Sequence, residues 1–319
     1  MSDLKRLLIV PRIKVQNANA LSSPFTVGFP AMTAWLGAVH ALQRKLQQVG
    51  YSNIQFESVG VISHQFDLQT HRGSGDFVAS IMGTANPSVF DPQYKKKYGD
   101  IYTSKFDAPL TRPSFIEEAR AHLTASLVIE YSGISADDKE QVLPVISELM
   151  HAQLKIAGGD ILAFEKPYFT NCESQKDTKH ILRKLMPGYV LLERRELMRE
   201  AMSHGQDALD ALIDHLAIHH SCLHENGNVV WQSGRKQKGW LVPIAVGFQG
   251  ISPLGRALNQ RDADTPHRFA EEVVTLGEFK MAHHIDDLST MQWRYQTDLD
   301  NNLYMCKTQG LENDLSAYF

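Results

Sequence analysis

The chain has 319 residues, which is enough for one large domain or two ordinary ones. Its hydrophobic content of 43% and charged content of 21% are typical of a folded globular protein and argue against a disordered chain. The net charge of −4 argues mildly against a free-standing nucleic-acid-binding domain, although a local basic patch is compatible with it.

The cysteines and the N-terminus indicate the cellular compartment that we expect for this chain. Cys172, Cys222 and Cys306 are far apart and form no CxxC pair, which argues against a disulfide framework or a zinc site. The N-terminus lacks the apolar core and cleavage site of a signal peptide. No stretch reaches the roughly 18 to 20 apolar residues that a membrane span needs. We therefore expect a cytoplasmic protein with no membrane partner, no metal and no cofactor.

The first elements predicted in chain order are a strand, a loop, a helix and a second strand. Strands are expected at 4–15 and 54–68, where apolar residues run continuously or alternate with polar ones. A polar, turn-rich loop is expected at 17–30. Apolar residues then recur at helical spacing over 31–49, and Gly50 is a plausible stop.

The regular pattern breaks after the second strand. Residues 71–113 hold four glycines and four prolines, and we interpret the segment at about 70–114 as an insertion. Order returns with a strand at 122–131 and a helix at 137–157, followed by a glycine turn and a further strand from Ile161.

This element order predicts the fold class of the first half. Strand, helix, strand, strand, helix, strand is the order of ferredoxin-like domains, including the RNA-recognition fold, whose open sheet face can hold single-stranded RNA. We predict an α+β protein with a ferredoxin-like (modified RNA-recognition) domain over 1–166. An irregular α+β C-terminal portion is predicted over 167–319.

The sequence of the second half predicts shorter and less regular elements. They are a turn and a strand at 185–193, a largely helical segment at 194–220, a polar basic loop at 226–238, a strand at 240–248 broken by Pro243, and an amphipathic helix at 266–280.

Polar side chains gather where the first strand runs into its loop. Amides and hydroxyls suit base edges and phosphate oxygens, and an arginine suits a phosphate or a stacked base. The alternative is a turn in which Asn and Ser bond the backbone. These candidate RNA contacts are Arg12, Gln16, Asn17, Asn19, Ser22 and Ser23.

Three basic groups add further candidate RNA contacts, and each has a solvated surface segment as its alternative. In the insertion, a lysine run lies beside Tyr94 and Tyr98, and such a mixture suits a backbone groove with base stacking. The other two groups precede Trp240 and follow Pro253. The candidates are Lys95, Lys96, Lys97, Arg235, Lys236, Lys238, Arg256, Arg261 and Arg268.

Signs of catalysis are sparse. The sequence has no Walker loop, GxGxxG, GxSxG elbow or paired-carboxylate motif. His215 and His219 have i, i+4 spacing but lack an HExxH context, so we predict no metal site. His40 and His64 leave open an RNA-cleaving enzyme with either as general base, although neither has a visible nucleophile or carboxylate partner.

Ordered motifs along nearly the whole chain resemble one family. They are PR at 11–12, QNANA at 16–20, SSP at 22–24, GFP at 28–30, HALQR at 40–44, EEARAHL at 117–123, LKIAGG at 154–159, LRKLMPGYVLLERREL at 182–197, GWLVPIAVGFQGISPL at 239–254 and TPHRFAE at 265–271. In this order they resemble the RAMP-family subunit of the type I-F CRISPR surveillance (Csy) complex, which holds the 5′ handle of the guide RNA.

The resemblance implies a role in antiviral defence without catalysis. It implies a tight heterodimer with the large subunit of the complex, next to the first backbone subunit, and together they cap the 5′ handle of the crRNA. Guide processing falls to a different subunit. Target DNA is then reached indirectly, because base pairing with the guide reads its sequence. The alternative that stays open is an RNA-cleaving RAMP endoribonuclease.

Overall fold

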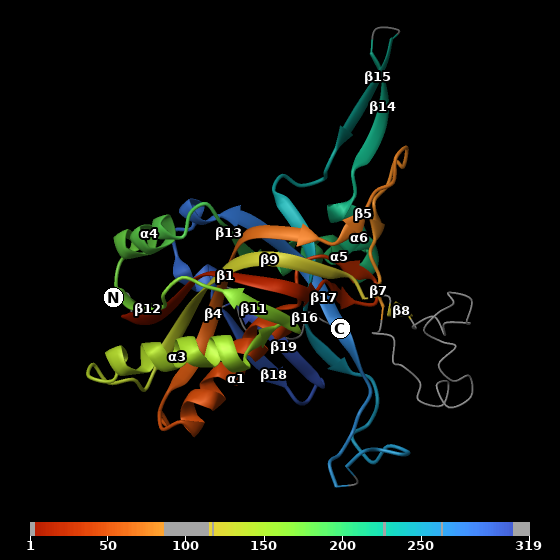
Figure 1. Cartoon of the computed structure of the whole chain (residues 1–319). Coiled ribbons are helices and arrows are strands. Elements are labelled where there is room, and N and C mark those ends of the chain that lie inside the picture. Colours follow the sequence, from red (N-terminus) through yellow and green to blue (C-terminus); the bar gives the residue numbers. More distant parts are fainter. Residues whose placement is uncertain (1–3, 86–114, 117, 226–227, 263, 309–319) are drawn as a thin grey trace, which may run out of the picture.

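The computed structural model describes residues 4–85, 115–116, 118–225, 228–262 and 264–308 (Figure 1). Its first part contains β1 (Lys5–Asn19), β2 (Leu21–Ser23), β3 (Thr26–Val27), α1 (Met32–Gln48), β4 (Gln55–Leu68), β5 (Thr70–His71), β6 (Ser80–Ile81), β7 (Thr84–Ala85), β8 (Phe115–Ile116), β9 (Arg120–Ser132), α3 (Lys139–Gln153), β10 (Lys155–Ile156) and β11 (Gly159–Ala163).

The remaining elements alternate short helices with longer strands. They are β12 (Tyr168–Cys172), α4 (Gln175–Lys184), β13 (Tyr189–Glu193), α5 (Arg195–Ser203), α6 (Ala208–Leu216), β14 (His219–Glu225), β15 (Asn228–Gly234), β16 (Trp240–Gly250), β17 (Ala270–Met281), η2 (Ala282–His284), η3 (Leu288–Met291), β18 (Trp293–Asp298) and β19 (Leu303–Thr308). No helix in the described ranges is long and apolar enough to cross a membrane.

One large sheet organises the molecule. Its strand order is β10-β11-β1-β9-β4-β13-β17-β16-β19-β18, and β12 also pairs with β1. These pairings are antiparallel, so the mixed α+β architecture is dominated by an antiparallel sheet. Both β13 and β18 pair with β4, which closes the C-terminal strands back onto the first half. Strand pairings thus cross residue 166, and the boundary placed there stays a prediction.

Around the first residues of β1 the sheet is covered on both faces, which explains the continuous apolar run in this strand. Leu8 and Val10 pack in the core that contains α1 and α3. Leu7 and Ile9 pack on the opposite face, in a second core with residues of α4, η2 and η3. A strand buried on both faces needs apolar residues at every position rather than at alternate ones.

The structure confirms most elements predicted for the first half. Strands occupy 5–19, 55–68 and 120–132, and α1 ends one residue before its Val49 cap, with Gly50 beyond it. The helix predicted at 137–157 is shorter, because β10 begins already at Lys155.

Three predictions for the second half are wrong or incomplete. The segment 266–280 is not a helix: it forms β17, in which Val273, Val274 and Thr275 favour a strand flanked by β13 and β16. Pro243 does not break its strand, because β16 has a strand neighbour on only one side there, opposite Leu276. The segment predicted as a basic loop at 226–238 instead contains β15, the second strand of a hairpin.

The segment predicted as largely helical at 194–220 is confirmed as α5 and α6, but the chain turns to strand at His219. From there β14 and β15 form a two-stranded hairpin that extends away from the body of the molecule (Figure 1). The hairpin adds no strand to the large sheet, since its two strands pair only with each other.

Candidate nucleic-acid interface

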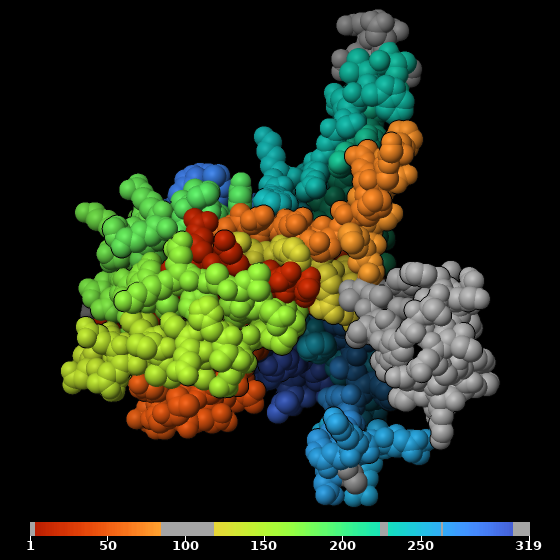
Figure 2. Space-filling model, in the orientation of Figure 1, coloured from red at the N-terminus to blue at the C-terminus, as the bar shows by residue number. Residues whose placement is uncertain are grey.

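The face of the sheet opposite α1 and α3 is open beyond the second core. Across this open part, Lys14 of β1 lies opposite Thr124 of β9, and Thr124 lies opposite Gln65 of β4. Their neighbours Ile13, Val15, Leu123 and Ala125 are buried on the α1 and α3 side, so the three polar side chains face the other way. Figure 2 shows red residues of the N-terminal region reaching the surface between green and yellow segments.

We define the sheet-face patch as Lys14, Gln16, Gln65, His122 and Thr124. Lys14, Gln16 and Gln65 are exposed, and His122 and Thr124 are half-buried. The patch offers amide, hydroxyl and imidazole groups that can bond to base edges. The exposed Asp67 lies opposite His122, and its negative charge nearly balances the positive charge of Lys14.

Two bulges in β1 set the border of this patch. The register of β1 against β9 shifts between Val10 and Ile13, and again between Val15 and Ala18. Within these shifts Arg12 has φ 51° and Asn17 has φ 56°. Bulges redirect side chains and are frequent next to functional sites, and asparagine adopts a positive φ more readily than arginine. Both bulged residues are candidates from the sequence.

Arg12 is held by two partners from distant parts of the chain. Its backbone N–H donates to Ser126 Oγ (2.9 Å), and its guanidinium Nη2 donates to the carbonyl of Met186 (2.7 Å). Arg12 is half-buried. The turn at Met186 and Pro187 therefore links the C-terminal portion to the edge of the sheet-face patch.

His64 is tied into the same network. Its Nδ1 lies 2.6 Å from the carbonyl of Pro187, and its Nε2 lies 2.6 Å from Ser126 Oγ. A carbonyl only accepts, so Nδ1 carries the hydrogen and Nε2 of the neutral ring accepts from the Ser126 hydroxyl. Burial lowers the pKa of His64 below its ordinary value of 6.5, and the Arg12 charge acts in the same direction.

This network bears on the RNA-cleaving alternative. A serine and a histidine 2.6 Å apart have the spacing of a nucleophile and its base. However, Ser126 is completely buried and its oxygen already accepts the Arg12 N–H, so a substrate cannot reach it. His40 is exposed on α1, on the face of the sheet away from the patch.

The other polar residues of the first loop serve the turn itself. The Asn19 side chain bonds the N–H and the carbonyl of Leu21. The hydroxyls of Ser22 and Ser23 lie 3.1 and 2.6 Å from Thr26 Oγ1, and Ser23 is only 3% exposed. These contacts match the turn that the sequence left as the alternative. Asn19 and Ser22 also line a surface cavity of about 460 Å³ together with Arg120 and Gly158.

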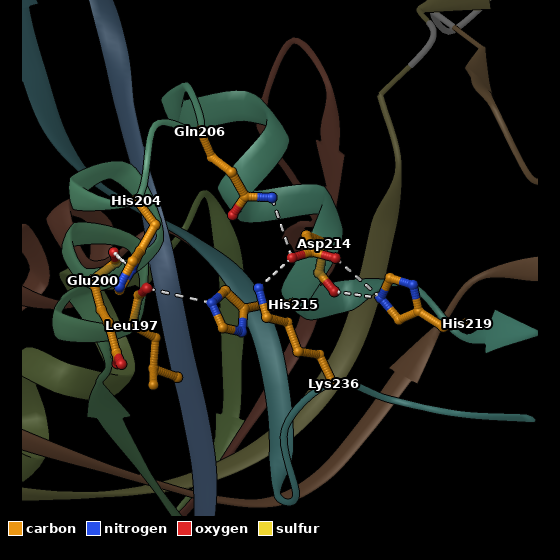
Figure 3. Close-up of polar contacts among 8 residues, drawn as sticks. All are labelled: Leu197, Glu200, His204, Gln206, Asp214, His215, His219 and Lys236. Atoms are coloured by element: carbon orange, nitrogen blue, oxygen red, sulfur yellow. Dashed lines mark hydrogen bonds and ion pairs between the residues drawn. The ribbon is translucent and has the colours of Figure 1, made fainter.

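The basic group at 235–238 lies at the base of the projecting hairpin (Figure 3). Lys236 forms an ion pair with Asp214 of α6, whereas Arg235 makes only a long contact of 3.5 Å to the carbonyl of Leu241. Lys238 is exposed. Lys236 is thus already neutralised by a carboxylate, which makes it a weaker candidate for a phosphate than its two neighbours.

The two histidines with i, i+4 spacing do not point at a common site. His215 is buried and its Nε2 donates to the Leu197 carbonyl (3.3 Å), whereas His219 donates to the Asp214 carbonyl (2.8 Å) (Figure 3). Among the described residues, no group of three or more His, Cys, Asp or Glu side chains is placed to hold a metal ion.

The remaining candidates are scattered. Arg256 and Arg261 are exposed in the segment between β16 and β17, away from the patch. Arg268 bonds Asn302 Oδ1 and packs on Gly250. Lys95, Lys96 and Lys97 lie outside the described residues, as does most of the predicted insertion. The structure thus places Gln16 in the sheet-face patch and Arg12 and Asn17 at its border, and it places the other described candidates elsewhere.

Four residues of the patch were not expected from the sequence. Lys14, Gln65, His122 and Thr124 are the outward positions of alternating strand segments, and that alternation is the only signal they carry. They become one surface only through the pairing of β9 with β1 and with β4, because the three strands are far apart in the sequence.

Comparison with known proteins covers both halves of the fold. A family model described as CRISPR-associated protein (Cas_Csy2) matches residues 8–306. The CRISPR-associated protein Csy2 of Pseudomonas aeruginosa (strain UCBPP-PA14) is 31% identical to this chain over 339 aligned residues, which cover 97% of each protein. These matches confirm the resemblance that the ordered motifs indicate.

Proposed function

Because the chain belongs to the Csy2 family of CRISPR-associated proteins, we propose that it is a non-catalytic, RNA-binding subunit of a type I-F effector complex. In this proposal it caps the 5′ handle of the crRNA together with the large subunit, beside the first backbone subunit. It meets target DNA only indirectly, since the guide reads the target by base pairing. The complex would act in the cytoplasm.

The observation that supports RNA binding is the sheet-face patch on β1, β9 and β4. The four strands β11, β1, β9 and β4 lie in this order, with α1 and α3 on one face. This order supports a ferredoxin-like domain over 1–166, with the C-terminal portion over 167–319. In RNA-recognition domains the face opposite the helices holds the RNA, and the patch is the part of that face left open here.

The RNA-cleaving alternative has less support. Both ring nitrogens of His64 are engaged, and Ser126 is buried beneath it. Incubating the purified chain with repeat RNA tests this directly, with His64→Ala and His40→Ala as comparisons. We expect no cleavage by the wild-type chain. Cleavage that either substitution abolishes would replace the non-catalytic proposal.

The experiment that tests RNA binding is reconstitution with the other complex subunits and a guide RNA carrying the 5′ handle. We expect Lys14→Glu combined with Gln16→Ala to weaken handle binding by about 10- to 100-fold, since a lost charged hydrogen bond costs about 1.5 to 3 kcal/mol. The control is Arg44→Glu at an exposed position of α1. It changes the net charge by the same amount on the opposite face of the sheet. Normal handle affinity of the patch variant, with the large subunit present, would contradict the proposal.

A further inference from the structure

The sequence of α4 contains both a capping box and a buried apolar side. Ser174 caps its start: the Ser174 hydroxyl oxygen accepts from the N–H of Asp177 (3.3 Å), and the Asp177 carboxylate accepts from the N–H of Ser174 (3.0 Å). Thr178, Ile181 and Leu182 are buried on the side that packs against the sheet. One face of α4 is therefore fixed inward, and the opposite face is fixed outward.

The outward face of α4 is basic. Lys176, Arg183 and Lys184 are exposed, and their spacing of seven and eight residues places them on one side of the helix. We call these three residues the α4 basic face. Within the described part of the chain, no acidic side chain pairs with them, whereas their neighbour Lys179 pairs with Asp286 (3.2 Å).

Helix stability explains only part of this arrangement. Arg183 and Lys184 stand in the last turn, where cations interact favourably with the helix dipole. Lys176 stands in the first turn, where the dipole disfavours a positive charge, and the three cations also repel one another. A partner with negative charge along its length would offset both costs.

Helix α4 leads into a turn that contacts the border of the sheet-face patch. Helix α4 ends at Lys184, and two residues later the carbonyl of Met186 accepts from the guanidinium of Arg12. Arg12 in turn borders the patch through the bulge of β1. The turn that follows α4 is thus hydrogen-bonded to the residue that borders the patch.

We propose that the α4 basic face binds the sugar-phosphate backbone of the RNA strand whose bases lie on the sheet-face patch. The inference rests on the proposed RNA-binding function and extends it to a second surface. The patch has a single free lysine and a nearby aspartate, so it supplies hydrogen bonds to bases but little charge. Affinity for a polyanion comes mainly from phosphate neutralisation, and α4 supplies the cations that the patch lacks.

The choice of a nucleic-acid backbone over an acidic protein follows from the same geometry. The three cations lie along one side of α4, with Lys176 about two helical turns from Arg183 and Lys184, and no exposed apolar residue of α4 lies among them. A protein interface normally has an apolar centre with charge at its rim. Cations arranged along a helix without an apolar centre are better suited to the repeating phosphates of a nucleic-acid backbone.

The test uses the full chain and a labelled, unstructured single-stranded RNA, titrated at a series of salt concentrations. Variant one is Lys176→Gln, Arg183→Gln and Lys184→Gln together. The control is Arg44→Gln, Lys45→Gln and Lys139→Gln on α1 and α3, which removes the same charge from the other side of the sheet. Circular dichroism and thermal unfolding of each variant check that α4 and the fold persist.

We expect variant one to bind RNA at least tenfold more weakly and the control to bind normally. The plot of log affinity against log salt should become shallower by about 2, because each lost phosphate contact of a single strand contributes about 0.7. Unchanged affinity and slope, or an equal loss in the control, would overturn the inference. So would normal RNA binding combined with loss of a protein subunit from the complex, since the face would then bind an acidic protein. If the wild-type chain itself fails to bind RNA, alone and with the large subunit, the proposed function fails first.

Discussion

Ser126 joins three parts of the chain through one hydroxyl group. Its oxygen accepts the N–H of the bulged Arg12 in β1, and its hydrogen is donated to Nε2 of His64 in β4. His64 then reaches the C-terminal portion through the carbonyl of Pro187. Because Ser126 is fully buried, water cannot replace its bonds if the hydroxyl is lost.

Removing this hydroxyl should destabilise the fold. We expect Ser126→Ala to lower the free energy of unfolding by about 1 to 3 kcal/mol, because a buried N–H is left without its acceptor. Urea unfolding followed by circular dichroism measures this. Ser52→Ala is the matched control, since Ser52 is exposed and should change stability by less than about 0.5 kcal/mol. A Ser126→Ala variant as stable as the wild-type chain would show that the network is not structural.

His64 should make the stability of the chain depend on pH. Its pKa in the folded chain is lower than its ordinary value of 6.5, so between these two values the unfolded chain binds a proton that the folded chain does not. The stabilisation is therefore complete above about pH 6.5 and is lost as the pH falls through the window below it. Unfolding free energies at several pH values should decline more steeply for wild type than for His64→Gln. An equal decline of the unfolding free energy with falling pH in wild type and in His64→Gln would show that His64 is not the source of the pH dependence.

At the scale of the element, one carboxylate holds both ends of the projecting hairpin. Asp214 of α6 pairs with Lys236, which follows β15, and lies 3.3 Å from Nε2 of His219, which begins β14 (Figure 3). Gln206 donates to the same carboxylate (3.3 Å). The hydrogen bond from Lys236 is the main cause of the lowered pKa of Asp214. This carboxylate therefore keeps its charge to a lower pH than an ordinary aspartate does.

Loss of that charge should loosen the hairpin without unfolding the chain. We expect Asp214→Asn to speed amide hydrogen exchange in β14 and β15 while leaving β1, β4 and β9 unchanged, because the large sheet makes none of the lost contacts. Asp210→Asn on the same helix is the control. Hairpin exchange rates equal to those of wild type would mean that strand pairing alone fixes its base.

The sequence predicts elements best where burial imposes one pattern. The continuous run at Leu7 to Val10 and the helical spacing over 31–49 leave little choice, and both are confirmed. The segment 266–280 fits helical spacing equally well, and its strand state depends on pairing with β13 and β16, which no local pattern reveals. The same limit applies to the site: Arg12, Gln16 and Asn17 are recognisable in one loop, whereas His122 and Gln65 join them only through pairing.

At the scale of the whole molecule, the net charge is −4, but the α4 basic face is locally positive. The C-terminal strands close onto β4, and α4, η2 and η3 cover part of the sheet face that an RNA-recognition domain leaves open. The remainder stays open as the sheet-face patch, and the turn after α4 contacts Arg12 at its border. In the proposed function, the chain directs one limited surface toward RNA, and the acidic remainder can face water or protein partners.

The most direct test of RNA binding at this surface is photo-crosslinking of a handle-containing guide RNA to the chain within the assembled complex, followed by mass spectrometry of the linked peptides. We expect crosslinks in β1 around Lys14 to Asn17 and in β9 around His122 to Thr124, and none in the exposed residues of α1 and α3. Crosslinks confined to α1 and α3, or an absence of crosslinks to this chain while its partner subunits are labelled, would contradict the account.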